Sequence, residues 1–178
     1  MRRASAAALV CATVLSASGA GADEAGTRLG LMLGRTEQVG SLGNRFDLGW
    51  TFGLEAGWMP SWAGFVWSIS YTYFSASDGR DPIQTLTLWD FGASFRARAP
   101  LRRTGIPIFG YGQVGLAILR ASTALPPDDS MTFFGPKLGV GLETHWSWFF
   151  LGVEADYGLI TGGPSGLQIL TRLGAGRF

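Results

Sequence analysis

The chain has 178 residues, enough for one domain, and its formal net charge is only +1. Charged residues make up 15%, aromatic residues 13%, and glycine occurs 27 times. This composition excludes a disordered chain and disfavours helices, because a glycine inside a helix costs about 1 kcal/mol relative to alanine. The near-neutral charge argues against a nucleic-acid partner, since phosphate binding needs a basic stripe.

Residues 1–22 have the features of a secretory signal peptide. Two arginines precede a short apolar run, and Ala20-Gly21-Ala22 forms an A-x-A cleavage signal. The run is too short to span a bilayer, which needs about 20 residues. We therefore expect a mature domain over 23–178 with a formal charge of −1, because two arginines and no acidic residue are removed. Cys11 is the only cysteine and lies in the removed segment, so disulfides and thiolate metal sites are excluded from the mature chain.

After the signal peptide, apolar and polar residues alternate, which predicts strands whose two faces meet different surroundings. The pattern is cleanest from Phe46 to Trp58, where aromatic and aliphatic residues occupy the even positions and Gly, Thr, Asp and Glu the odd ones. In chain order the alternation predicts eight strands: 29–33, 46–58, 65–73, 89–97, 108–118, 134–142, 149–157 and 167–173.

Turn residues separate these segments, among them Pro60, Pro100 and Pro126-Pro127. Two prolines fall within segments instead. Pro107 can begin its strand, whereas Pro136 predicts a bulge, because proline cannot donate to a sheet ladder.

The composition of the two faces predicts an all-β fold, an eight-stranded antiparallel transmembrane β-barrel, rather than a soluble β-sandwich. The polar face of a sandwich would carry many lysines and glutamates. Here it is mostly Gly, Ser and Thr, and Lys137 is the only lysine. An aromatic outside suits lipid, and a polar inside suits a narrow, packed lumen.

An even number of strands returns the chain to the periplasmic side, where such barrels have short turns. We therefore expect periplasmic turns at 60–64, 99–105 and 144–148, and outward loops at 36–45, 75–82, 120–130 and 160–166. Five tryptophans then fall near the periplasmic rim, as an aromatic girdle requires: Trp58, Trp62, Trp67, Trp146 and Trp148.

Charged residues gather on the polar face. An arginine facing lipid at the bilayer midplane costs roughly 2–4 kcal/mol, so these charges must point into the lumen. The interior of an eight-stranded barrel is just wide enough for side chains, where opposite charges should pair. The predicted lumen network comprises Asp47, Glu55, Asp90, Arg96, Lys137, Glu143, Glu154, Asp156 and Arg172, with Arg28 beside them. It forms either a structural plug or a gated proton or ion path.

Two motifs suggest chemistry. His145 and Ser147, with Glu154 on the adjoining strand, resemble the His-x-Ser and glutamate arrangement of outer-membrane lipid A deacylases, in which histidine is the base and serine the nucleophile. Trp148 follows the serine where that family has asparagine. The run 110–115 matches G-x-G-x-x-G, but a strand pattern continues through it and no helix follows, so we expect no cofactor. We also expect no metal.

The end of the chain and its glycine-rich strands resemble the outer-membrane protein A-like family. Phe178 closes an alternating last strand, and the runs 110–115 and 139–143 are similar to the glycine-aromatic strands of that family. The resemblance implies a location in the outer membrane of a Gram-negative envelope and a recognition signal at Phe178. It also implies envelope chaperones and the barrel-assembly machinery as partners.

These observations predict a non-catalytic, monomeric outer-membrane barrel with a plugged polar lumen and a structural or surface-interaction role. Its partners would be outer-membrane lipids and lipopolysaccharide. The alternatives are a narrow, porin-like channel for small solutes and, third, a lipid A-modifying hydrolase.

Overall fold

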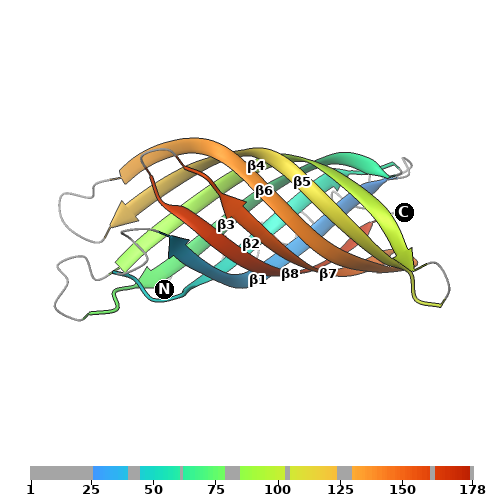
Figure 1. The fold of residues 1–178 in the computed structure, drawn as a ribbon, viewed down its shortest axis with the longest axis horizontal. Coiled ribbons are helices and arrows are strands. Elements are labelled where there is room, and N and C mark those ends of the chain that lie inside the picture. Colours follow the sequence, from blue (N-terminus) through green and yellow to red (C-terminus); the bar gives the residue numbers. More distant parts are fainter. Residues whose placement is uncertain are drawn as a thin grey trace, which may run out of the picture.

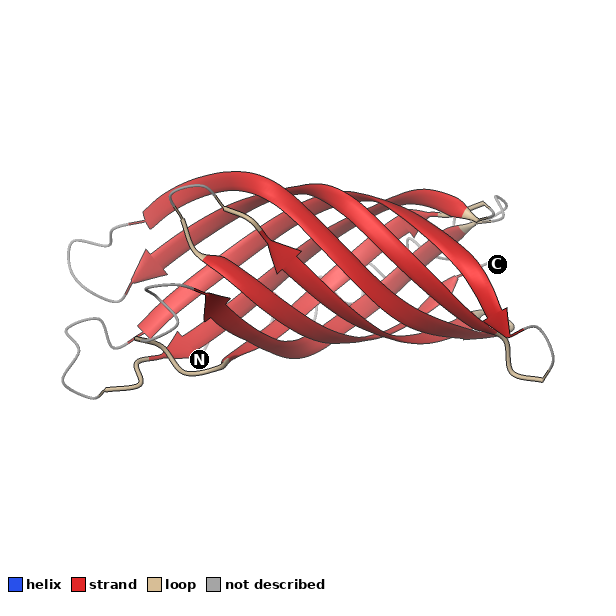
Figure 2. Ribbon diagram, viewed as in Figure 1, coloured by secondary structure: helices blue, strands red, loops and turns tan. Residues whose placement is uncertain are grey.

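The computed structural model describes residues 26–39, 45–60, 62–78, 85–102, 105–123, 130–160 and 163–176. Their regular elements are strands alone (Figure 2): β1 (Thr27–Val39), β2 (Gly49–Trp58), β3 (Ala63–Ser75), β4 (Thr85–Arg102), β5 (Ile108–Thr123), β6 (Ser130–Trp146), β7 (Phe149–Gly158) and β8 (Ser165–Gly176). Each strand pairs antiparallel with the next, and β8 pairs with β1 to close a barrel (Figure 1). The predicted eight-stranded antiparallel barrel is confirmed. The signal peptide over 1–22 and Phe178 lie outside the described residues.

The described residues include no helix that is long and apolar enough to cross a membrane.

The strands run obliquely along the barrel, and their connections differ at its two ends (Figure 1). The turn end, on the right in the figure, carries the connections β2–β3, β4–β5 and β6–β7. There Ser147 and Trp148 alone join β6 to β7, and Ser147 takes a φ of 53°, a left-handed conformation that a tight hairpin requires. The loop end carries the other four connections. The connections therefore group at the two ends as predicted, although β1, β4, β5 and β6 extend into segments predicted as turn or loop.

The two faces of the sheet differ as the alternation predicts. Trp50 is exposed on the outside, whereas its neighbour Thr51 is fully buried inside. Thr51 joins a chain of hydroxyl groups along the lumen face of β1, β2 and β3, with its Oγ1 2.5 Å from that of Thr36 and 2.9 Å from that of Thr72. The outer surface is an apolar belt that water would not stabilise but lipid would.

The aromatic side chains of the belt gather near both ends. Four of the predicted girdle residues, Trp58, Trp62, Trp146 and Trp148, are exposed at the turn end, while Trp67 lies further along β3, opposite Ala56. A second group at the loop end was not predicted. It comprises Trp50, Tyr71, Tyr73 and Trp89, and the rings of Tyr71 and Trp89 are 5.1 Å apart. An aromatic group at each end is the arrangement of a barrel that crosses both membrane interfaces.

Two details of the predicted strands are wrong. The alternation over 46–58 breaks where Asp47 and Leu48 are both exposed, so Phe46 points into the lumen and β2 begins only at Gly49. Pro136 forms no bulge, because β6 passes it in unbroken register with β5, and its pairing with β7 begins one residue later, at Lys137.

The register shift of the barrel lies elsewhere, between Pro100 and Arg102 in the β4–β5 ladder. Pro100 was predicted in a connection but lies within β4, beyond the last pair that β4 makes with β3 at Ala97. Its missing N–H is therefore tolerated, because no ladder on that side needs it.

The apolar belt predicts that the stability cost of placing an arginine on the outer face depends strongly on its depth in the bilayer. Val140 is 64% exposed in the middle of β6, whereas Trp148 lies at the turn end. Val140→Arg is expected to lower the free energy of unfolding by about 2–4 kcal/mol in a bilayer, and Trp148→Arg by about 0–1 kcal/mol. Urea titration of protein refolded in vesicles measures both. Equal losses for the two variants would contradict the assignment of the outer face to lipid.

Candidate functional site

The middle of the lumen is filled by an ion-pair network centred on Arg172 of β8. Its Nη1 donates to Glu154 Oε2 at 2.8 Å and to the Tyr111 hydroxyl at 2.9 Å, and its guanidinium also pairs with Glu55. Arg96 donates from Nη2 to the same Glu154 oxygen at 2.9 Å. Tyr111 in turn donates its O–H to that oxygen at 2.6 Å. Strands β2, β4, β5, β7 and β8 are thus tied together across the lumen.

Gln113 of β5 extends this network toward the loop end. Its Oε1 accepts from Arg96 Nε at 3.0 Å, and its Nε2 donates to Glu154 Oε1 at 3.0 Å and to Asp156 Oδ1 at 2.8 Å. Beyond it lies Lys137 of β6, whose Nζ is 3.3 Å from Asp90 and 3.2 Å from Asp156.

A third group closes the turn end. Arg28 of β1 donates to Glu55 Oε1 at 2.9 Å and to Glu143 Oε2 at 2.5 Å, with its guanidinium 4.0 Å from the centre of the Phe150 ring. His145 Nε2 lies 2.5 Å from Glu143 Oε1, and its ring stacks on Phe109 at 4.9 Å.

Arg98 of β4 adds a fifth cation to the third group, with its Nη1 4.0 Å from Glu143 Oε1, and the charges of the three groups then balance. Five cations face five carboxylates: Arg28, Arg96, Arg98, Lys137 and Arg172 against Glu55, Asp90, Glu143, Glu154 and Asp156. Each of these side chains is at most 9% exposed. A buried charge is tolerated only when it is paired and hydrogen-bonded, so the balance explains how so many ions fit inside one barrel.

Glycines on the lumen face make the room that these long side chains occupy. A Cβ at Gly30 would lie 3.1 Å from Glu55 Cγ and 2.8 Å from the Phe150 ring, and one at Gly139 would collide with Asp156 and Gln113. These two positions admit no side chain while the network stands.

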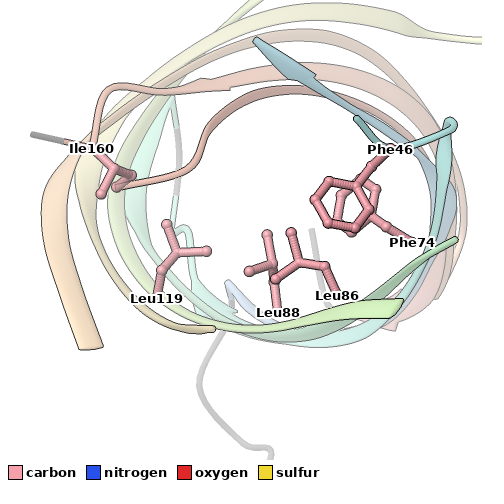
Figure 3. Close-up of a cluster of buried hydrophobic side chains, with 6 residues drawn as sticks. All are labelled: Phe46, Phe74, Leu86, Leu88, Leu119 and Ile160. Carbon is pink, nitrogen blue, oxygen red and sulfur yellow. The ribbon is translucent and has the colours of Figure 1, made fainter. Parts of the chain in front are cut away.

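Above the ions, at the loop end, the lumen becomes apolar. Figure 3 shows six side chains that point inward from the barrel wall and its loop-end connections. We call them the apolar collar: Phe46, Phe74, Leu86, Leu88, Leu119 and Ile160. They are buried, and Phe46 and Phe74 meet edge to face with their centroids 6.5 Å apart. The lumen therefore has an ionic layer below and, above it, a layer in which the apolar collar lies beside the buried polar side chains Thr36 and Gln38.

Two small cavities lie among these layers. One of about 30 Å³ lies between Lys137 and the collar residues Leu88 and Leu119, and one of about 10 Å³ lies beside Arg96 and Arg172. Lys137 lines both. Each has room for about one or two water molecules, far less than an aqueous channel needs.

The structure brings together eight of the nine predicted lumen residues and separates one. Asp47 is exposed before the start of β2, so its predicted place in the network is wrong. The reason is the break in alternation at that strand end.

The predicted histidine, serine and glutamate are not brought together either. His145 contacts Glu143, whereas Glu154 is bound by Arg96, Arg172 and Tyr111. A serine needs a base within hydrogen-bond reach to become a nucleophile, and Ser147 lies in the hairpin turn. The sequence reasoning missed Tyr111, Gln113 and the collar, although Tyr111, Gln113 and four of the six collar residues lie at lumen-facing positions of their strands. The other two collar residues, Phe46 and Ile160, lie just outside β2 and β7.

The closed barrel, the apolar belt and the filled lumen define a small membrane-spanning barrel. No protein-family model and no curated protein sequence matches the chain. Neisserial surface protein A superposes with a TM-score of 0.66 at 18% identity, over 85% of this chain and 97% of that one. Ail, the attachment invasion locus protein of Yersinia pestis, gives 0.53 at 16% over 85% and 96%.

The N-terminal β-barrel domain of Pseudomonas aeruginosa OprF gives a TM-score of 0.51 at 13% identity, over 83% of this chain and 96% of that one. At these identities the likeness establishes the fold: the chain has the fold of the small eight-stranded outer-membrane β-barrels. The predicted outer-membrane location agrees with these neighbours and with the apolar belt.

Proposed function

We propose that this protein is a non-catalytic, non-conducting outer-membrane barrel. Its lumen is a structural plug, and its interactions take place on the outer surface and at the loop end. One observation carries the proposal. The five cations and five carboxylates of the lumen pair with one another in an almost fully buried network that joins strands on all sides of the barrel.

A neutral, interlocked network opposes ion passage in two ways. It presents no net charge that would attract one sign of ion, and an ion could enter only by displacing side chains that are already paired with opposite charges. The collar adds an apolar layer where water is poorly held, and hydrophobic constrictions of this kind exclude ions by dewetting. A conducting channel needs a continuous wet path instead, and cavities of about 30 and 10 Å³ do not supply one.

Planar-bilayer recording tests the proposal directly. Mature protein refolded in detergent, with its unboiled band migrating ahead of the boiled one, is expected to insert without producing measurable current. A known open porin, refolded and added in the same way, serves as the control for insertion. Steady conductance from the native barrel would overturn the proposal and favour the narrow channel.

A further inference from the structure

Arg35 lies on the outer face of the barrel rather than in the lumen. Arg35 of β1 follows Leu33 on the apolar belt and is paired across the sheet with Trp50 of β2 and Ile169 of β8. Both of these neighbours are exposed toward the membrane. Arg35 lies near the loop-end limit of β1, at the level of the second aromatic group.

The contacts of Arg35 differ from those of the lumen arginines. Its guanidinium lies 4.0 Å from the centre of the Trp50 ring, and it makes no hydrogen bond or ion pair with any other described residue. The side chain is half-buried. Five N–H donors are therefore held at a membrane-facing surface on an aromatic ring, without an acceptor from the described part of the chain.

An arginine in this position needs an acceptor from outside the protein. At the bilayer midplane a lipid-facing arginine costs several kcal/mol, whereas near the interface the cost falls close to zero, because headgroups reach it. Guanidinium groups bind phosphate through two parallel hydrogen bonds, and stacking on an aromatic ring holds the guanidinium plane in place. Trp50 also marks this depth, since tryptophan favours the interface.

We propose that Arg35 and Trp50 form a binding site for a phosphate group of the lipid A headgroup of lipopolysaccharide. The inference rests on the proposed outer-membrane location, because the loop end then faces the outer leaflet, where that glycolipid lies. Glu37 is exposed two residues nearer the loop end on the same face, and its carboxylate would repel a phosphate there. The phosphate site is therefore at Arg35 and Trp50 rather than nearer the loop end.

Arg120 provides a matched comparison. It is also exposed on the outer face near the loop end, opposite Trp89, but its Nη2 already donates to Ser130 Oγ at 3.3 Å. Removing either arginine deletes one positive charge from the same rim. Of these two described arginines, only Arg35 combines a ring beneath the guanidinium with donors that lack an acceptor among the described residues.

Native mass spectrometry of the refolded barrel in detergent tests the site with three probes: bisphosphorylated lipid A, dephosphorylated lipid A and phosphatidylglycerol. The native protein is expected to retain bisphosphorylated lipid A. Arg35→Gln should reduce this retention about tenfold, the effect of losing a charged hydrogen-bonding pair, and Trp50→Leu should reduce it less. Arg120→Gln should change it less than about twofold.

Three results would overturn the site: undiminished retention by Arg35→Gln, equal retention of the dephosphorylated probe, or an equal loss in Arg120→Gln. Retention of phosphatidylglycerol as strong as that of lipid A would overturn the choice of glycolipid. Heat-dependent gel migration shows whether each variant is folded. Bilayer recording of the same variants tests the plugged lumen independently of the lipid A site. A barrel that conducts but still loses lipid A with Arg35→Gln refutes the plug alone, and a closed barrel whose Arg35→Gln variant keeps lipid A refutes the site alone.

Discussion

Arg172→Ala is expected to lower the free energy of unfolding by about 3–5 kcal/mol, the range for removing one partner of a buried ion pair. Arg172 is fully buried and bonds to Glu154 and Tyr111 while pairing with Glu55. Its loss leaves two carboxylates with less positive charge around them and removes a hydrogen-bond donor from the Tyr111 oxygen. Urea unfolding in vesicles, followed by tryptophan fluorescence, measures the difference.

A double variant separates charge from packing. Arg172→Met keeps most of the volume, and Glu154→Gln removes one carboxylate, so together they restore equal numbers of opposite charges. Replacing a buried ion pair by uncharged groups of similar volume is often close to neutral, so the double variant should be clearly more stable than Arg172→Met alone. If the double variant is as unstable as the single one, the network does not stabilise the barrel through its charges.

The strand pattern was readable from sequence because lipid and lumen impose opposite chemistry on alternate residues. Trp50 and Thr51 are adjacent in the chain yet lie on opposite sides of the wall. The rule failed at Phe46 and Asp47, where the strand had not yet begun and nothing forced alternation. Strand ends are set by loops and by pairing partners, and neither is visible in a short periodic segment.

The apolar collar was missed for a different reason. Leu88 and Leu86 continue the positions of Asp90 and Arg96 on β4, so the same alternation, extended toward the loop end, places them inside. The assumption that every apolar residue faces lipid concealed them. Extending the face assignment by position rather than by polarity would have found the collar residues that lie within strands, Phe74, Leu86, Leu88 and Leu119, but not Phe46, where the alternation fails.

Charge partners across the lumen could not be read from one sequence. Arg28 and Glu143 are 115 residues apart and meet only because the barrel closes. The sequence predicts which charges face inward, since the alternation fixes the face. Which charges meet depends on the stagger accumulated around eight strands, and a shift of one residue in any ladder would change the pairs.

Lys137→Ala is expected both to destabilise the barrel and to begin to open its lumen. Lys137 is the cation nearest to Asp90 and Asp156, so its loss should cost about 3 kcal/mol, the lower end of the range, because the neighbouring cavity lets water approach the carboxylates. The side chain also lies between the two cavities and lines both. Alanine joins them.

The charged residues lining the joined cavity would be four carboxylates, Glu55, Asp90, Glu154 and Asp156, and two guanidinium groups, Arg96 and Arg172. The excess of negative charge means that any current should be carried by cations. We expect brief, low-conductance openings in planar bilayers, because the collar still narrows the loop end. Lys137→Met is the matched control, since it removes the charge but keeps the length of the side chain, and it should lose similar stability without conducting. Current through both variants would show that charge alone closes the lumen, and silence from both would place the closure at the collar.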